Sequence, residues 1–470
     1  MKQRIEAFVE GHREAMLSDI KELIAVRSVR GDAEPGKPYG PGPAAAMEKA
    51  AAIAARHGFE AKNVGGHMLE INLNDGEDEL GILCHLDVVH EGSGWTTPPY
   101  EADVRDGRIY GRGAADNKGP AMAALYALKC VRELGVPLSK NVRLMLGTDE
   151  ENGSNDLKAY TKLRALPNYC FSPDAAFPVY NIEKGRYATY FSSDFPDDGA
   201  LPRLTALSAG HALNIVPDEA VATVEGLPHA GFGMDKLKEA VSAQGEKTGV
   251  SFSLEESGGA LVLRAKGVGT HASYPDEGKN ALTALLALLA TLPLADSEGF
   301  SKIKALAALF PYGDNAGEAL GVKMEDELSG PLTSNLAALE YSVGGLRGGF
   351  DLRCPICSNE ENTSRVISAK MAEAGMRTET DEMVLPHHVP EDLPFIQVLM
   401  NVYESYTGLK GECVSMGGGT YVHGLKNCVA FGAAYPDTET YAHAADEYSV
   451  IAELEACVKI FAQSIIDVCS

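Results

Sequence analysis

The segment Asn141–Gly153, N-V-R-L-M-L-G-T-D-E-E-N-G, constrains the fold of this chain more than any other. It begins with an apolar run of strand length, Val142–Leu146, and ends in three acids, Asp149–Glu151. Unpaired carboxylates at the end of a buried strand are very costly to desolvate. In open α/β sheets, ligands bind just beyond the carboxyl ends of strands. The segment therefore indicates either a cation beside these acids or a solvated acidic turn, and the rest of the chain must decide.

Composition narrows the class of protein. The 470 residues are 45% hydrophobic and 23% charged, with a net charge of −25, so we expect two or more globular domains. No basic patch is visible, which argues against nucleic acid and anionic membrane surfaces as partners. The N-terminus lacks an apolar signal core, and the apolar stretch 281–295 is too short to span a bilayer and indicates a buried helix. Nine scattered cysteines fit reduced thiols, so we expect a cytoplasmic protein.

The first part of the chain alternates between strands and helices. Helical periodicity covers 3–27, 44–57 and 120–134, and strand patterns cover 69–74, 81–84, 142–146 and part of 169–174. Polar clusters follow several of these strands. This order is typical of a doubly wound α/β sheet.

Past Lys184 the pattern changes, because strands and helices continue without acids at the strand ends. We therefore predict an α/β fold in which a doubly wound, mixed-sheet domain is interrupted by an inserted α+β domain. The predicted boundaries are 1–185, 186–385 and 386–470, with helices over 234–245, 280–292, 393–406 and 447–468 and strands over 413–416 and 429–431. His387 and His388 are expected in a surface loop at the return to the first domain.

Five candidate metal ligands stand near the predicted strand ends: His85, Asp116, Glu151, Asp174 and His443. Histidine with carboxylate suits Zn²⁺ and similar transition ions, whereas an all-oxygen set would suit Ca²⁺ or Mg²⁺. Five ligands are too many for one tetrahedral ion, but they fit two ions that share a carboxylate. Such ions lie ~3.5–4 Å apart and hold a bridging water whose pKa falls toward ~7.

Two neighbouring acids have predicted roles in catalysis. Glu150, beside Glu151, is placed to act as general base on that water. Asp87, two residues after His85, is placed to accept the second imidazole N–H and to fix its tautomer.

Five motifs now form a recognisable order. They are H-L-D-V-V from His85, G-R-G-A-A-D-N-K-G from Gly111, G-T-D-E-E-N-G from Gly147, S-P-D from Ser172 and H-A-A-D-E from His443. This order resembles the co-catalytic zinc peptidases of the aminoacylase and carboxypeptidase type. The length, the segment Gly92–Tyr100 and the large insertion are most similar to the bacterial dipeptidase V (carnosinase-like) branch.

The resemblance implies a dinuclear metal site. Asp116 would bridge the ions, with Glu151 and His443 on one ion and His85 and Asp174 on the other. Glu150 would be the base. The ions would be Zn²⁺ by family default, with Mn²⁺ or Co²⁺ also suited to these donors. The implied activity is hydrolysis of dipeptides that carry a free C-terminal carboxylate.

The resemblance also implies functional residues in the insertion, or lid. His271 would reach the substrate carbonyl, and Asn214 would lie near the same oxygen. Arg353 would hold the terminal carboxylate, for which a planar bidentate donor is suited. Gly418 and Gly419 would offer backbone N–H groups to it, although such a loop is also found in ordinary tight turns. The insertion is long enough for two sheet-and-helix lobes, so we expect a monomer that supplies His271 in cis.

One position departs from the family pattern, because Asn117 stands where a second Asp usually follows the bridging acid. Relatives often have a cis peptide at this bond, and the sequence leaves that detail open. Two other functions also stay open. The same site would serve an N-acyl amino-acid deacylase, and a non-catalytic binding protein could retain the fold. The complete ligand set and the intact Glu150 favour an enzyme.

Overall fold

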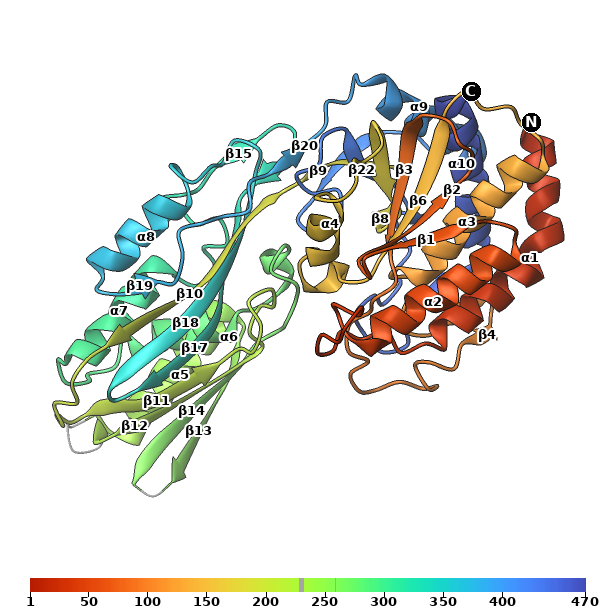
Figure 1. The fold of residues 1–470 in the computed structure, drawn as a ribbon. Coiled ribbons are helices and arrows are strands. Elements are labelled where there is room, and N and C mark those ends of the chain that lie inside the picture. Colours follow the sequence, from red (N-terminus) through yellow and green to blue (C-terminus); the bar gives the residue numbers. More distant parts are fainter. Residues whose placement is uncertain (228–231, 258) are drawn as a thin grey trace. The chain divides into compact units, whose positions relative to one another are not determined.

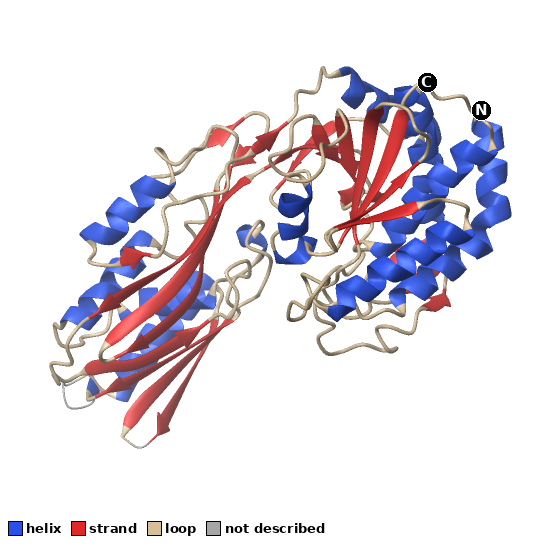
Figure 2. Ribbon diagram, in the orientation of Figure 1, coloured by secondary structure: helices blue, strands red, loops and turns tan. Residues whose placement is uncertain are grey.

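The computed structural model describes residues 1–227, 232–257 and 259–470 (Figures 1 and 2). The chain forms two compact units. The first unit comprises Met1–Glu183 and His387–Ser470, and the inserted unit comprises Lys184–Pro386. These boundaries fall within two residues of the predicted ones.

The first unit combines helices with a large sheet. Its helices are α1 (Lys2–Ile24), α2 (Pro41–Arg56), α3 (Lys118–Glu133), α4 (Asn155–Tyr160), α9 (Pro394–Thr407) and α10 (Ile451–Cys469), with the short 3₁₀ helix η1 (Glu150–Asn152). Its strands are β1 (Ala61–Val64), β2 (Met68–Asn72), β3 (Asp78–His85), β4 (Asp103–Arg105), β5 (Arg108–Tyr110), β6 (Asn141–Gly147), β7 (Tyr169–Ser172), β8 (Ala175–Ala176), β9 (Val179–Glu183), β20 (His387–His388), β21 (Cys413–Met416), β22 (Cys428–Ala430), β23 (Ala433–Ala434) and β24 (Tyr448–Val450).

The main sheet of this unit is mixed. Its order among the described residues is β1-β2-β6-β3-β7-β22-β9-β20, with β21 also paired to β9. The strands β6, β3, β7 and β22 run parallel, and antiparallel pairs lie toward both edges. In the register of β3 and β6, His85 lies opposite Gly147, so these two strands end at the same level. The α/β mixed-sheet prediction is confirmed.

Both faces of this sheet are covered, as the continuous apolar runs of parallel strands require. Successive side chains point to opposite faces, so Ile82 and Leu144 join a large core with α1, α2, α3, α9 and α10. Leu83 and Met145 instead join a smaller core with Tyr160 of α4 and Tyr421. The two layers hold the strand ends rigidly, which positions the residues that follow them.

The inserted unit is an α+β layer. Its strands are β10 (Gly185–Asp194), β11 (Arg203–Ala209), β12 (Glu219–Glu225), β13 (Ser251–Ser257), β14 (Ala260–Lys266), β15 (Glu325–Asp326), β16 (Gly330–Pro331), β17 (Thr333–Ser342), β18 (Gly345–Cys354) and β19 (Arg377–Thr378); its helices are α5 (Met234–Thr248), α6 (Ala281–Leu289), α7 (Glu298–Leu309), α8 (Ser364–Glu373) and the short η3 (Pro275–Glu277). The sheet order is β13-β14-β12-β11-β17-β18-β10-β19, entirely antiparallel. The expected buried helix is α6, whose apolar side chains pack into the core of this unit.

At two places the structure corrects or completes the predictions made from the sequence. His387 and His388 do not form a surface loop, because they pair with Glu183 and Ile182 of β9. His387 is buried, with Nε2 2.8 Å from the carbonyl oxygen of Cys428, a long-range contact that no local pattern could reveal. The peptide bond between Asp116 and Asn117, which the sequence left open, is cis.

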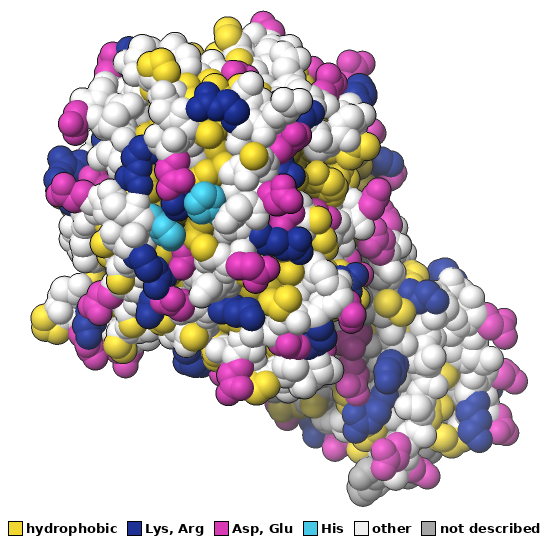
Figure 3. Space-filling model, turned by 90° about the vertical axis from the view of Figure 1, so that its right-hand side faces the viewer, with side chains coloured by type: hydrophobic (Ala, Val, Ile, Leu, Met, Phe, Trp, Pro, Cys, Tyr) yellow, Lys and Arg dark blue, Asp and Glu magenta, His cyan; other side chains and the backbone are white. Residues whose placement is uncertain are grey.

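The distribution of charge on the surface and the length and polarity of the helices are relevant to the partners considered from the sequence. On the face shown in Figure 3, Lys and Arg side chains are dispersed among Asp and Glu rather than gathered into one patch. Among the described residues, every helix is too short or too polar to cross a membrane.

Candidate metal centre

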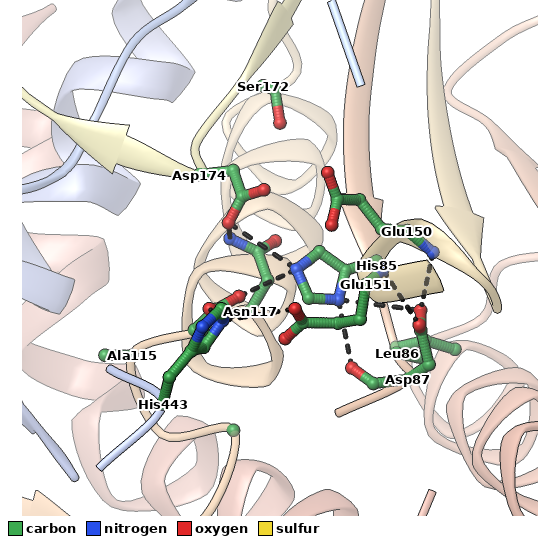
Figure 4. A network of polar contacts seen from close by, with 12 residues as sticks. His85, Leu86, Asp87, Ala115, Asn117, Glu150, Glu151, Ser172, Asp174 and His443 are labelled. Carbon is green, nitrogen blue, oxygen red and sulfur yellow. Dashed lines mark hydrogen bonds and ion pairs between the residues drawn. The ribbon is translucent and has the colours of Figure 1, made fainter. Parts of the chain in front are cut away.

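Three parallel strands deliver candidate ligands to one edge of the sheet (Figure 4). β3 ends on His85, η1 after β6 carries Glu150 and Glu151, and Asp174 follows β7. The carboxyl ends of parallel strands meet at one edge, so residues far apart in sequence become neighbours there. Asp116 precedes α3, and His443 comes from the loop before β24.

The five predicted ligands form two groups that share Asp116. One group is His85, Asp116 and Asp174, and the other is Asp116, Glu151 and His443; within each, the candidate ligand atoms lie within 4.8 Å of one another. His85 Nε2 is 2.8 Å from Asp116 Oδ1, and His443 Nε2 is 2.8 Å from Asp116 Oδ2. His85 Nε2 is also 3.5 Å from Asp174 Oδ1, and His443 Nε2 is 3.1 Å from Glu151 Oε2.

The donor atoms suit bound cations. His85 Nε2 and Asp116 Oδ1 are both buried and lie 2.8 Å apart, but neither has the geometry of a hydrogen bond to the other or to any other described group. Buried polar atoms normally find partners, so such a pair needs an explanation. Burial, followed by the charge of Asp116, raises the pKa of Glu151 to about 7. The protein alone therefore supplies too little positive charge for its own carboxylates here.

The two histidines show the same demand for positive charge. Hydrogen bonds to Asp116 and Glu151 raise the pKa of His443 to about 11. Burial lowers the pKa of His85, but the charge of Asp174 and the close contacts with neighbouring carboxylates raise it well above its usual range. A divalent cation would replace these protons, because a ligating imidazole must be neutral. The residues present fit two such ions.

Asp87 contacts both His85 and η1, but the predicted contact between its carboxylate and the His85 imidazole is not formed. His85 Nδ1 is 2.9 Å from the backbone carbonyl of Asp87, whereas Asp87 Oδ1 is 3.6 Å from that nitrogen, beyond hydrogen-bond range. The Asp87 carboxylate instead accepts hydrogen bonds from the backbone N–H groups of Glu150 and Glu151, at 3.1 and 3.2 Å. Asp87 thus orients His85 through its main chain and holds η1 through its side chain.

Glu150 lies within the site without being one of the clustered ligands. Its carboxylate points toward the space between His85 and Asp174 (Figure 4). Burial, followed by the charge of Asp174, raises its pKa well above the usual range for glutamate. Asp149, the first acid of the same run, is buried and neutralised by Arg30 Nη1 at 2.7 Å. Only two of the three consecutive acids therefore face the site.

Glu447 is the residue that sequence reasoning missed. It is fully buried and accepts hydrogen bonds from the backbone N–H groups of Gly113, Ala115 and Asp116, at 2.9–3.1 Å, and from Arg112 Nη1 at 2.6 Å. It therefore holds the loop that carries Asp116. The available signal was its place as the last residue of the H-A-A-D-E motif, four positions after His443.

Asn117, which stands where the resemblance implies a second acid, makes two hydrogen bonds that suit an amide. Its Nδ2 donates to Asp174 Oδ1 at 3.0 Å and to the carbonyl of Pro173 at 2.8 Å. An amide can make both of these bonds, whereas an ionised carboxylate has no proton to donate. Asn117 therefore holds Asp174 without adding negative charge.

Known proteins resemble this chain in sequence and in fold. The sequence profile described as Peptidase family M20/M25/M40 matches residues 81–467. The chain is 37% identical over 463 residues to the Bacillus subtilis protein named "Putative dipeptidase YtjP", covering 96% of this chain and 97% of that protein. A Staphylococcus saprophyticus relative with a similar name is 33% identical, covering 98% of each chain.

The chain belongs to peptidase family M20/M25/M40. It is a peptide hydrolase. Its fold resembles the crystal structure of human carnosine dipeptidase 1, with a TM-score of 0.61, 16% sequence identity and coverage of 99% and 98% of the two chains. The inserted α+β unit is part of that shared fold.

The glycine-rich loop of this peptidase lies in the first unit. Gly418 and Gly419 precede Thr420, whose backbone N–H and hydroxyl both donate to Glu183 Oε1, at 3.2 and 2.8 Å. Glu183 is fully buried at the end of β9, and His423 Nδ1 is 2.8 Å from its other oxygen. The loop is therefore fixed at one end by a carboxylate.

The other predicted residues of the peptidase lie in the inserted unit. Asn214 and His271 are exposed neighbours, because the backbone N–H of Ala272 donates to the carbonyl of Asn214 at 2.8 Å. Arg353 is buried on β18, where Nε donates to Asp351 Oδ1 at 2.6 Å and Nη2 donates to Asp351 Oδ2 at 3.2 Å. Asp351, two residues earlier on the same strand, therefore fixes the orientation of the Arg353 guanidinium.

Proposed function

We propose that this peptidase is a metal-dependent dipeptidase acting on dipeptides with a free C-terminal carboxylate. The observation that carries the proposal is Asp116, whose two oxygens each face one histidine at 2.8 Å in two overlapping ligand groups. His85 and Asp174 would hold one divalent ion, and Glu151 and His443 would hold the other. When bound, such a pair of ions activates a water molecule and stabilises developing negative charge on the carbonyl oxygen.

Glu150 would be the general base. It would take a proton at its carboxylate and later pass it to the leaving amine. A carboxylate whose pKa is raised by burial is better matched to this work near neutral pH than an exposed one. The hydrogen bonds from the η1 backbone to Asp87 keep Glu150 and Glu151 in distinct directions. The two neighbouring acids can therefore have separate roles.

The carboxylate preference rests on two groups of residues. Arg353 is already held in place by its bidentate contact with Asp351, so little side-chain entropy would be lost when the guanidinium donates to a further anion. Gly418 and Gly419 would offer backbone N–H groups to the same carboxylate. Asn214 and His271 would donate to the substrate carbonyl oxygen. We propose that all of these come from one chain, acting as a monomer.

Several properties accompany this proposal. Zn²⁺ suits the mixed histidine and carboxylate donors, and Mn²⁺ and Co²⁺ suit them as well. The nine cysteines are all free, which supports action in the reducing cytoplasm. The substrates would be small dipeptides, with neither nucleic acid nor membrane as a partner.

The decisive experiment measures hydrolysis of a dipeptide library by the purified protein after loading with Zn²⁺, Mn²⁺ or Co²⁺. The matched substrates are each dipeptide, its C-terminal amide and the corresponding N-acetyl amino acid. Turnover confined to free-acid dipeptides supports the proposal. Faster turnover of N-acetyl amino acids would replace it with the deacylase function, and absence of all turnover by metal-loaded protein would refute both.

A further inference from the structure

A cavity of about 220 Å³ lies beside the candidate metal ligands, lined entirely by residues of the first unit. Asp116 and Asp174 form part of its lining. Much of the remaining wall is made of small side chains on two short strands, β8 and β23, which pair in parallel. Ala433 lies opposite Ala175, and Ala434 lies opposite Ala176. Backbone pairing therefore gives this wall a fixed shape.

The lining residues indicate which end of a dipeptide the cavity would receive. Among the described residues, those that line it include neither Glu150 nor any part of the glycine-rich loop Gly417–Thr420. Under the proposed function, that loop binds the C-terminal carboxylate. The scissile bond must lie at the ions held by Asp116 and Asp174. A cavity that adjoins Asp116 and Asp174 but not the carboxylate-binding loop is suited to the N-terminal residue of the substrate.

The chemistry of the wall sets the kind of side chain that fits. Methyl groups and Leu454 supply apolar surface, whereas the charged lining residues are all acidic: Asp116, Asp174 and Glu453. Glu453 is held in place, because it accepts hydrogen bonds from the backbone N–H of Tyr435 at 3.0 Å and from the Thr438 hydroxyl at 2.6 Å. Because Asp116 and Asp174 would be balanced by the ions they hold, Glu453 is the lining carboxylate whose charge a substrate side chain would meet. An anionic side chain would lie against Glu453, and the described lining includes no Lys, Arg or His to offset the contact; like charges in contact are strongly unfavourable.

The volume also limits the occupant. At about 220 Å³ the cavity is smaller than the roughly 300–1,000 Å³ of typical small-molecule sites, so it has room for one part of a ligand rather than a whole one. That space suits an aliphatic side chain of small to medium size.

We propose that this cavity binds the side chain of the N-terminal residue of the substrate and selects uncharged aliphatic side chains against acidic ones. The inference rests on the proposed dipeptidase function. It adds the identity of the preferred substrates, which the metal ligands alone do not specify.

The first test uses the unaltered, metal-loaded enzyme and three dipeptides that share a C-terminal residue: Leu-Ala, Ala-Ala and Glu-Ala. We expect kcat/KM for Leu-Ala to exceed that for Glu-Ala at least about tenfold, a typical scale for pocket selectivity. Equal or faster turnover of Glu-Ala overturns the inference while leaving the dipeptidase function intact. Absence of turnover on all three refutes the proposed function and this inference with it.

The second test fills the cavity. Ala434→Leu should lower kcat/KM for Leu-Ala about tenfold or more and leave Gly-Ala unchanged, because glycine places no side chain there. The matched control is Ala55→Leu, at an exposed position on α2 outside the cavity, which should change neither substrate. Equal losses on Leu-Ala and Gly-Ala would overturn the inference.

Two further variants protect this test against trivial outcomes. Ala176→Val, on the paired strand, gives the same comparison if Ala434→Leu does not fold. Metal content, measured by elemental analysis of each variant, should equal that of the unaltered enzyme. Glu453→Gln should raise turnover of Glu-Ala relative to Leu-Ala, and an unchanged ratio would contradict the proposed charge selection.

Discussion

Buried charges in the first unit gather where parallel strands end, whereas charged pairs on the inserted sheet, such as Arg347 with Glu379 and Arg264 with Glu219, lie exposed to solvent. The difference follows from strand direction. Parallel strands bring the residues that follow them to one edge, but the ends of antiparallel strands alternate between opposite edges. The first unit can therefore bring several charged side chains together at one edge of its sheet. In the inserted unit, charged side chains are spread over the antiparallel sheet.

The inserted unit has a notable exception to this division. Asp351 is fully buried on β18 and binds Arg353 as well as Arg186, whose Nη2 lies 2.7 Å from Asp351 Oδ2. This small network includes Arg353, which the resemblance implies in substrate binding. Each unit thus has a buried charge network that includes candidate functional residues.

The largest effect is expected from the acids of η1. Glu150→Gln should leave metal content unchanged and lower activity ~10²–10⁴-fold, because proton transfer is lost. Glu151→Gln should instead lower metal content. The control is Glu373→Gln at an exposed position of the inserted unit, with no expected effect on either quantity. Full activity of metal-loaded Glu150→Gln would show that another group is the base.

Breaking a buried ion pair of the first unit should lower the free energy of unfolding more than breaking an exposed ion pair of the inserted unit. Glu447→Ala leaves Arg112 buried without its carboxylate and should lower the free energy of unfolding by ~3–5 kcal/mol. Glu379→Ala breaks the exposed pair with Arg347 and should cost ~0–1 kcal/mol. Urea unfolding at pH 7 compares the two variants. Similar losses would mean that burial does not decide the effect.

The lid histidine tests whether the units of one chain act together. His271→Ala should lower activity, since a donor to the oxyanion is worth ~3–4 kcal/mol of transition-state stabilisation. Mixing His271→Ala protein with Glu150→Gln protein should restore no activity if each site is complete within its own chain. Recovery of activity in the mixture would show that His271 serves a partner subunit, and sedimentation of the unaltered protein provides an independent check.

The carboxylate preference should depend on Arg353. The unaltered enzyme should favour a dipeptide over its C-terminal amide by ~1.5–3 kcal/mol, because a neutral amide cannot accept the charge-assisted hydrogen bonds that a carboxylate would accept from Arg353. Arg353→Lys should reduce this preference, since lysine cannot form the planar bidentate contact. Arg347→Lys, on the same strand and exposed, is the matched control. The measurement is the ratio of kcat/KM for the two substrates.

The smallest effect concerns pH. Burial, partly offset by a hydrogen bond from Tyr421, raises the pKa of Asp156 to about 6. A raised folded-state pKa means that the stability contributed by protonated Asp156 is present below pH ~4 and is lost as the pH rises through about 6.

Substitution should remove this dependence. Stability of Asp156→Asn relative to the unaltered protein should rise between pH 4 and pH 7 by at most ~3 kcal/mol. Asp467→Asn on α10 is the control, and urea unfolding across this pH range is the measurement. A constant difference between Asp156→Asn and the unaltered protein would contradict the expectation.

Local sequence determined much of the first unit. Apolar runs that end in charged residues specified β3, β6 and the residues that follow them, because a strand buried on both faces must be apolar throughout. The five candidate ligands were named as a set from their places near predicted strand ends, and they form two overlapping groups in the structure. The large inserted domain followed from the same pattern, since strands and helices continued there without acids at their ends.

Only the tertiary structure decided the contacts between distant segments. The carbonyl rather than the carboxylate of Asp87 meets His85 Nδ1, Glu447 holds a loop more than 300 residues before it, and four alanines from two strands line one cavity. His387 is buried for the same kind of reason, through a carbonyl 41 residues away. Local patterns report which face of an element is apolar. They do not report which atoms of two distant elements come within 3 Å of each other, and hydrogen bonding and pocket shape depend on that distance.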